Sequence, residues 1–252
     1  MSVNHITRTE INIGAVSAPL VARVNRRAKK LIVKVDPVTG EILVTAPSRR
    51  TLPDAIAFAH ERADWIAGQM KNAVRARPFA PNAIIPYRGV DHVIVQCGGP
   101  RAPVRVDHGS GRDHATAGAE RRPEIRVGGA AEHVNRRLTD WLKKQARQRL
   151  IERADHYSAR LGRKRGPVRV RDMRTRWGSC TSDGAMSFSW RLILTPPDIL
   201  DYVAAHECAH LVHMDHSRAF WSLLSTLDVD ARAAAAWFRE HGQALFAYGV
   251  SG

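Results

Sequence analysis

The sequence predicts an α+β protein, in which strands and helices are segregated along the chain instead of alternating strictly. Short β-rich runs bounded by turn residues fill much of the first half. A long amphipathic stretch at 131–161 and further helical patterns over 195–246 dominate the second half, interrupted by a hairpin pattern at 174–194. This order favours α+β over the regular strand–helix alternation of a parallel sheet.

The N-terminal part is expected to hold a β-hairpin followed by one helix. Residues 19–25 and 30–36 are rich in β-formers, and 30–36 leads through the turn PVTG into 41–47. Residues 51–74 read as one helix, with Thr51 as N-cap and proline and aspartate in its first turn. Three short strands are expected next, at 91–96, 102–106 and 123–127. The stretch at 107–122, before the last of them, is rich in glycine and charged residues and predicts a surface loop.

The second half contains a long basic helix, a strand at 166–173, a hairpin and a set of shorter helices. The hairpin turns at residues 182–184, and its second strand alternates apolar and polar residues, which predicts one buried face: Met186, Phe188, Trp190 and Leu192. The following helix is expected to begin with Thr195 as N-cap, Pro196 at its first position and Asp198 in its first turn. Helices at 217–227 and 230–246 complete the chain.

The composition limits the classes of protein to which the chain can belong. The chain has 252 residues, and 44% of them are hydrophobic, which is ordinary for a globular protein with a core. We find no apolar run near the roughly 18 residues of a membrane span and no convincing signal peptide. The three cysteines are scattered and form no CxxC pair. We therefore expect a cytoplasmic protein without a membrane partner and without a disulfide framework.

The net charge of +15 leaves a nucleic-acid partner possible. The basic residues are dispersed along the chain instead of gathered in one tail, and no nucleic-acid-binding motif accompanies them. Charge alone therefore does not identify a partner.

The segment His206-Glu207-Cys208-Ala209-His210 matches the pattern HExxH. Two imidazoles four residues apart lie on one helical face and can share one Zn²⁺, and the glutamate can take a proton from a metal-activated water. The apolar stripe of this helix, Ile199 and Val203, continues into the histidines. A metal would offset the cost of burying several imidazoles.

A catalytic zinc site needs three protein ligands, and the third is open to several candidates. His216 is favoured, because the turn after His210 can bring its ring back from another direction. His213 is on the correct face, but one ion would have to reach three rings along a straight helix. Glu240, the only glutamate after Glu207, and Asp215 are the remaining alternatives.

The motifs RWGSC, WRLIL, HExxH and HSxxFW, within residues 174–224, together resemble the core of the YgjP-like metallopeptidase family, which is related to SprT- and WLM-type zincins. Residues 26–70 resemble the N-terminal β-hairpin and helix of that family, and the resemblance covers about residues 20–245. Two departures stand out. Ser189 replaces an expected asparagine, and 107–120 looks like an insertion.

The resemblance implies a zincin-like core, with His206, His210 and His216 as zinc ligands and Glu207 as the catalytic base. We accordingly expect an N-terminal β-rich region with one helix over 1–130 and the catalytic core over 131–252, or one continuous unit over about 20–245. A zinc-dependent peptidase acting on a peptide or protein substrate follows as the leading hypothesis. The alternatives are a protein or protease associated with nucleic acid and a zinc-binding protein that is not a peptidase.

Other residues near the motif are open to two interpretations. Arg176 and Arg191 are candidates to bind a substrate carboxylate or stabilise an oxyanion, or they lie on a solvated strand face. The aromatic residues are expected mainly to pack around the site: Trp177, Trp190, Phe220 and Trp221. We expect the strand at 186–190, which precedes the HExxH helix, to be an edge strand along which an extended substrate pairs by β-augmentation.

Overall fold

The computed structural model describes residues 6–13, 16–36, 38–71, 76–107, 122–173 and 175–250. It divides the chain into two compact units, Met1–Ala76 and Arg77–Gly252. The predicted α+β class is correct. Residue 130, expected as a boundary, lies inside the second unit, where the helix that follows it packs on strand β8 (Glu124–Val127). The expected loop at 107–120 lies, apart from Asp107, outside the described residues.

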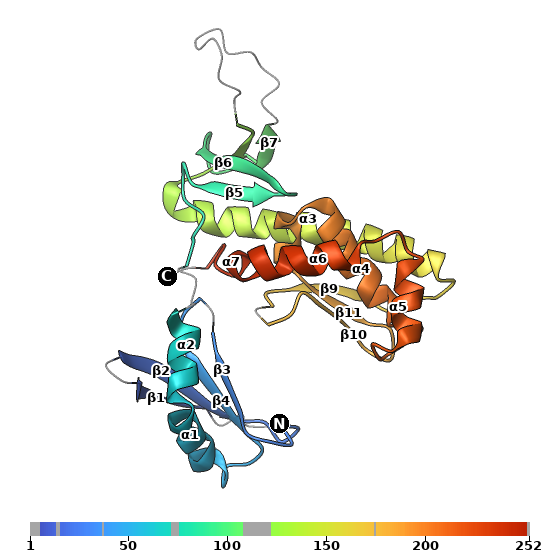
Figure 1. The fold of residues 1–252 in the computed structure, drawn as a ribbon. Coiled ribbons are helices and arrows are strands. Elements are labelled where there is room, and N and C mark those ends of the chain that lie inside the picture. The colour runs from blue at the N-terminus through green and yellow to red at the C-terminus, as the bar shows by residue number, and fades with distance from the viewer. Residues whose placement is uncertain are drawn as a thin grey trace. The chain divides into compact units, whose positions relative to one another are not determined.

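The first unit is a four-stranded sheet covered by two helices (Figure 1). Its strands lie in the order β1-β2-β4-β3: β1 Ile6–Ile13, β2 Val16–Val24, β3 Ile32–Val35 and β4 Ile42–Ala46. The antiparallel pairing of β3 with β4 confirms the predicted hairpin. The expected single helix is two, α1 Leu52–Glu61 and α2 Ala63–Lys71, and α1 ends where the N–H of Arg62 bonds the carbonyl of Ala59 at 3.2 Å.

The second unit begins with another four-stranded sheet, in the order β5-β6-β8-β7. Its further strands are β5 Ile84–Tyr87, β6 Val90–Gln96 and β7 Arg105–Asp107. In both four-stranded sheets the two central strands are parallel and each outer strand is antiparallel to its neighbour. The two sheets thus share one topology, a repeat that the sequence does not reveal.

Helix α3, Ala131–Arg160, connects several parts of the second unit (Figure 1). The sequence predicts a buried stripe of six residues on this helix. Four of them are fully buried and two are partly buried: Val134, Leu138, Leu142 and Leu150, and Trp141 and Ile151. The helix contacts β8, strand β9 (Val168–Arg171) and helix α4 (Pro197–Ala209), which carries the HExxH motif. It therefore joins the four-stranded sheet to the part of the unit that contains the histidines.

A three-stranded sheet in the order β10-β11-β9 lies beside α4. Strands β10, Gly178–Cys180, and β11, Met186–Ser189, form the predicted hairpin. The expected alternation up to Leu192 is wrong, because β11 ends at Ser189 and the chain enters the 3₁₀ helix η1, Trp190–Leu194, whose residues are all buried. The strand that precedes the HExxH helix is central, since β9 pairs with its other side, and β10 is the edge strand.

The C-terminal helices pack against this core. They are α5 Arg218–Ser225, α6 Ala231–Trp237, the π-helical turn η2 Phe238–Gly242 and the short α7 Gln243–Leu245. Ser217 caps α5 by accepting from the N–H of Phe220 at 3.5 Å, and Asp230 caps α6. Helix α4 contacts both α5 and α6. None of the helices among the described residues is long and apolar enough to cross a membrane.

Candidate metal centre

Helix α4 supplies the first half of the site. Two prolines start it, with Pro196 at the N-cap and Pro197 at its first position, one residue later than expected, because Thr195 ends the preceding 3₁₀ helix. Proline is well suited to this place, since its missing N–H would have no partner in the first turn. The helix then carries His206 and ends at His210, which is its C-cap residue. The chain therefore turns immediately after the second histidine of the motif.

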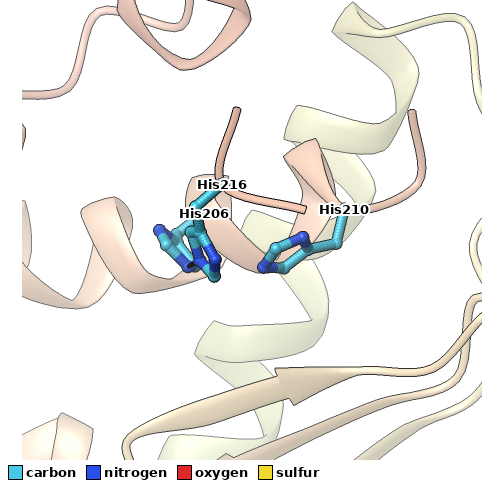
Figure 2. A group of neighbouring side chains, drawn as sticks. All are labelled: His206, His210 and His216. Atoms are coloured by element: carbon cyan, nitrogen blue, oxygen red, sulfur yellow. Dashed lines mark hydrogen bonds between the residues drawn. The ribbon is translucent and has the colours of Figure 1, made fainter. Parts of the chain in front are cut away.

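The imidazoles of His206, His210 and His216 converge (Figure 2). One ligand nitrogen from each lies within 4.8 Å of the others. The Nε2 atoms of His206 and His216 are 3.1 Å apart. Two nitrogens bound tetrahedrally to one Zn²⁺ at about 2.0–2.1 Å would lie about 3.4 Å apart, so this arrangement fits the ion.

Hydrogen bonds to two backbone carbonyls support the three histidines. The Nδ1 atom of His210 lies 2.9 Å from the carbonyl oxygen of His213, which leaves the Nε2 atom of His210 for the cluster. The indole N–H of Trp221 donates to the carbonyl oxygen of His216 at 3.0 Å. The loop between α4 and α5 is therefore held at His213 and at His216.

Phe220 forms an apolar floor under the three histidines. Its side chain is fully buried, and its ring centroid lies 5.0 Å from that of His206, 4.7 Å from His210 and 4.9 Å from His216. Such a floor keeps water away from one side of the rings and limits their rotation.

The electrostatic environment keeps His206 neutral. Burial above all, together with the neighbouring His210 and His216, lowers its pKa to about 4. Its Nδ1 atom is buried without a hydrogen-bond partner among the described residues. Zn²⁺ binds neutral imidazole, so this histidine is ready for a metal at neutral pH without losing a proton first.

Glu207 lies next to His206 on α4 and is only 6% exposed. Burial raises its pKa to about 7, against the opposing positive charge of Arg176. Its side chain packs against Gly178 of the edge strand β10. A carboxyl group with a pKa close to neutrality can both accept and release a proton.

The other candidates for the third ligand lie elsewhere. Glu240 has a 75% exposed side chain and lies 3.7 Å from His241. Asp215 accepts from the backbone N–H of Ser217 at 3.3 Å, and His213 contributes its carbonyl oxygen to His210. Within the described part of the chain, the group of converging ligand atoms contains only His206, His210 and His216.

Both expectations for Arg191 are wrong. Its side chain is 0% exposed. Its guanidinium group pairs with Asp172 and donates two hydrogen bonds, of 3.0 and 3.2 Å, to the carbonyl of Tyr248. The same group lies 4.5 Å over the ring of Trp190. Arg191 is therefore a structural residue that ties the C-terminal segment to η1, and it is not available to a substrate. Arg176 is exposed and acts electrostatically on Glu207.

The aromatic residues of the motifs divide into two groups. Trp190 and Phe220 are buried, as predicted for packing. Trp177 is half-buried and stacks with Phe238 and with Phe246, whereas Trp221 is 44% exposed. The hydrogen bond of Trp221 and the packing of Glu207 on Gly178 escaped the sequence analysis. Only the position of these residues inside the motifs HSxxFW and RWGSC could have pointed to them.

Ser189, the residue that departs from the expected pattern, is fully buried. Its hydroxyl donates to the carbonyl of Met173 at 3.5 Å and accepts from the N–H of Arg191 at 3.4 Å. It therefore caps the start of η1 in this chain.

The family model described as YgjP-like, metallopeptidase domain, matches residues 29–241. Neither the curated proteins nor the solved structures gave a match.

Proposed function

The chain belongs to the YgjP-like metallopeptidase family, and on this premise we propose that it is a zinc-dependent peptidase. His206, His210 and His216 would hold Zn²⁺, and Glu207 would act as general base. The observation that carries the proposal is the convergence of three imidazoles beside a buried carboxyl group on the same helix. A purely structural zinc site has no need of that carboxyl group.

Bound Zn²⁺ would polarise a peptide carbonyl and lower the pKa of water. Glu207 would take a proton from the attacking water and pass it to the leaving amine. Without the ion, burial raises its pKa to about 7, which strengthens the group as a base, and the positive charge of bound Zn²⁺ would lower that pKa. The apolar packing of Phe220 excludes water from the floor of the site.

The substrate would lie along β10 and not along β11. In the β10–β11 pairing, the N–H of Ser189 bonds the carbonyl of Trp177 at 2.9 Å, and the N–H of Thr181 bonds the carbonyl of Ala185 at 3.0 Å. The N–H and C=O groups of the intervening Gly178 and Cys180 therefore point away from β11. An extended peptide can add to this edge by β-augmentation beside Glu207.

Cys180→Pro tests this placement. Proline at an edge position removes one outward N–H and leaves the inner hydrogen bonds in place. The expected result is a KM for peptides that rises about tenfold, with the zinc content unchanged. Cleavage with an unchanged KM would exclude pairing at this edge.

The proposed location in the cytoplasm is inferred from the chemistry of the three cysteines. Cys97, Cys180 and Cys208 are all free thiols. Burial raises the pKa of Cys208 to about 12 and that of Cys180 to about 11, so neither is a reactive thiolate at neutral pH. Unpaired thiols suit the reducing cytoplasm that we propose.

Zinc-loaded protein is expected to hydrolyse unstructured peptides, and a chelator is expected to stop the reaction until Zn²⁺ is restored. Hydrolysis that continues unchanged in metal-free protein would refute a zinc-dependent mechanism.

A further inference from the structure

Gly178 on the edge strand β10 leaves no room for a side chain. A Cβ atom placed there would lie 2.4 Å from Oε1 of Glu207, 2.7 Å from its Cγ and 2.8 Å from its Cδ. All three distances are well inside van der Waals contact. Glu207 therefore occupies the space that any other residue at position 178 would fill.

The backbone conformation does not explain this glycine. Several glycines of the chain have a positive φ, where a side chain would be strained, but Gly178 is not one of them. Any residue could adopt its backbone angles, so the space taken by Glu207 is the reason for a glycine here.

The strand that carries Gly178 is held firmly. Gly178 lies opposite Phe188 in the β10–β11 ladder, and Ser189 donates its N–H to the carbonyl of Trp177. The ring of Trp177 stacks with two other rings, 4.9 Å from Phe238 and 4.6 Å from Phe246. The strand therefore cannot retreat from Glu207 without breaking this stack.

The helix on the other side is equally fixed. Ala205, Cys208 and Ala209 of α4 are 0% exposed. The Sγ atom of Cys208 lies 3.5 Å from the carbonyl oxygen of Ala154 on α3. With both backbones fixed, the side chain of Glu207 is the part that would yield to a larger residue at position 178.

We propose that Gly178 is a positioning residue of the active site, whose bare Cα keeps the Glu207 carboxyl group in the place from which it acts. This inference rests on the proposed role of Glu207 as general base. It gives the glycine of RWGSC a function separate from zinc binding and from pairing with the substrate, since alanine would keep the backbone N–H of residue 178.

The test is Gly178→Ala in the zinc-loaded full-length protein. The variant is expected to fold, to bind zinc in the wild-type ratio and to keep KM within about twofold. Its kcat is expected to fall about 10²-fold, because a misplaced catalytic group loses about that much. A crystal structure of the variant should show the Glu207 side chain displaced. Gly99→Ala is the matched control, because a Cβ there meets nothing within 4 Å and φ is not positive.

A second arm separates positioning from other roles. In a Glu207→Gln background the base is already absent, so Gly178→Ala should lower the residual activity less than about threefold. An equal 10²-fold loss in both backgrounds, or an undisplaced Glu207 with unchanged kcat, would overturn the inference. If the wild type cleaves no peptide while the crystal structure shows the displacement, the proposed function fails and the packing relationship stands.

Discussion

The indole N–H of Trp221 donates a hydrogen bond of 3.0 Å to the backbone carbonyl of His216. The bond holds the backbone of His216, one of the three converging histidines, and not its ring. The loss of a hydrogen bond that supports a metal-binding ring commonly weakens metal affinity 10- to 100-fold, so an effect at the low end of this range is expected here. Trp221→Phe keeps the aromatic ring and removes the donor. We expect its zinc dissociation constant, measured by chelator competition, to rise about tenfold.

Trp237→Phe is the control for that experiment, because the ring neighbours of Trp237 in the described structure are Phe238 and His241. Equal zinc affinities for both variants and the wild type would mean that the hydrogen bond does not position His216.

The ligand set predicts a contrast between two histidines three residues apart. His216→Ala removes a converging imidazole and is expected to lower the zinc content to a small fraction of the wild-type value. His213→Ala keeps the backbone carbonyl that orients His210, so its zinc content should stay near that of the wild type. Metal analysis of both purified variants decides the matter. The opposite pattern would move the third ligand to His213.

Metal-free protein should show a pH-dependent effect of Glu207→Gln on the free energy of unfolding. Burial raises the pKa of Glu207 from 4.5 to about 7, so the folded state holds this proton more tightly than the unfolded chain. The contribution is therefore fully present below about pH 4.5 and lost as the pH rises through about 7.

Glutamine is neutral throughout, so the variant should be more stable than the wild type by about 3 kcal/mol above about pH 8. The difference should vanish near about pH 4. Urea unfolding at both pH values measures it, and a difference that does not change with pH would show that the carboxyl group is not buried as described.

The ion pair between Arg191 and Asp172 is expected to stabilise the second unit. Arg191 is fully buried, so Asp172→Asn, which keeps the shape and removes the charge, should lower the free energy of unfolding by about 2 kcal/mol. Glu240→Gln removes one partner of an exposed pair and should change it by less than about 0.5 kcal/mol. Urea titrations compare the free energy of unfolding of the two variants. Equally small effects would show that the ion pair of Arg191 with Asp172 does not stabilise the second unit.

The sequence predicts the local parts of the fold well. The hairpins at β3–β4 and β10–β11 and the long helix α3 follow from turn residues and periodicity, and all three are present. The end of β11 at Ser189 could not be predicted, because the alternation of residues continues past it. The 3₁₀ helix that follows buries Arg191 against Asp172 and Tyr248, which are far from it in sequence.

The position of each strand in its sheet depends on contacts between residues far apart in sequence. Strand β11 pairs with β9 on one side and β10 on the other, so the expectation of an edge strand before α4 was wrong. For the site, the spacing of HExxH placed His206 and His210 on one face of α4. The contacts of Glu207 with Gly178 and of Trp221 with His216 are tertiary, and no local pattern encodes them. A nucleic-acid partner stays a prediction from charge.

The central claim is that the three histidines hold zinc for a reaction in which Glu207 moves the proton. The most direct measurement is the zinc content and peptide hydrolysis of wild-type and Glu207→Gln protein, purified and loaded in parallel. Glutamine has nearly the same shape but cannot take a proton, so the variant should bind zinc like the wild type and lose at least about 10²-fold in kcat. Wild-type turnover by the zinc-loaded variant would contradict the claim.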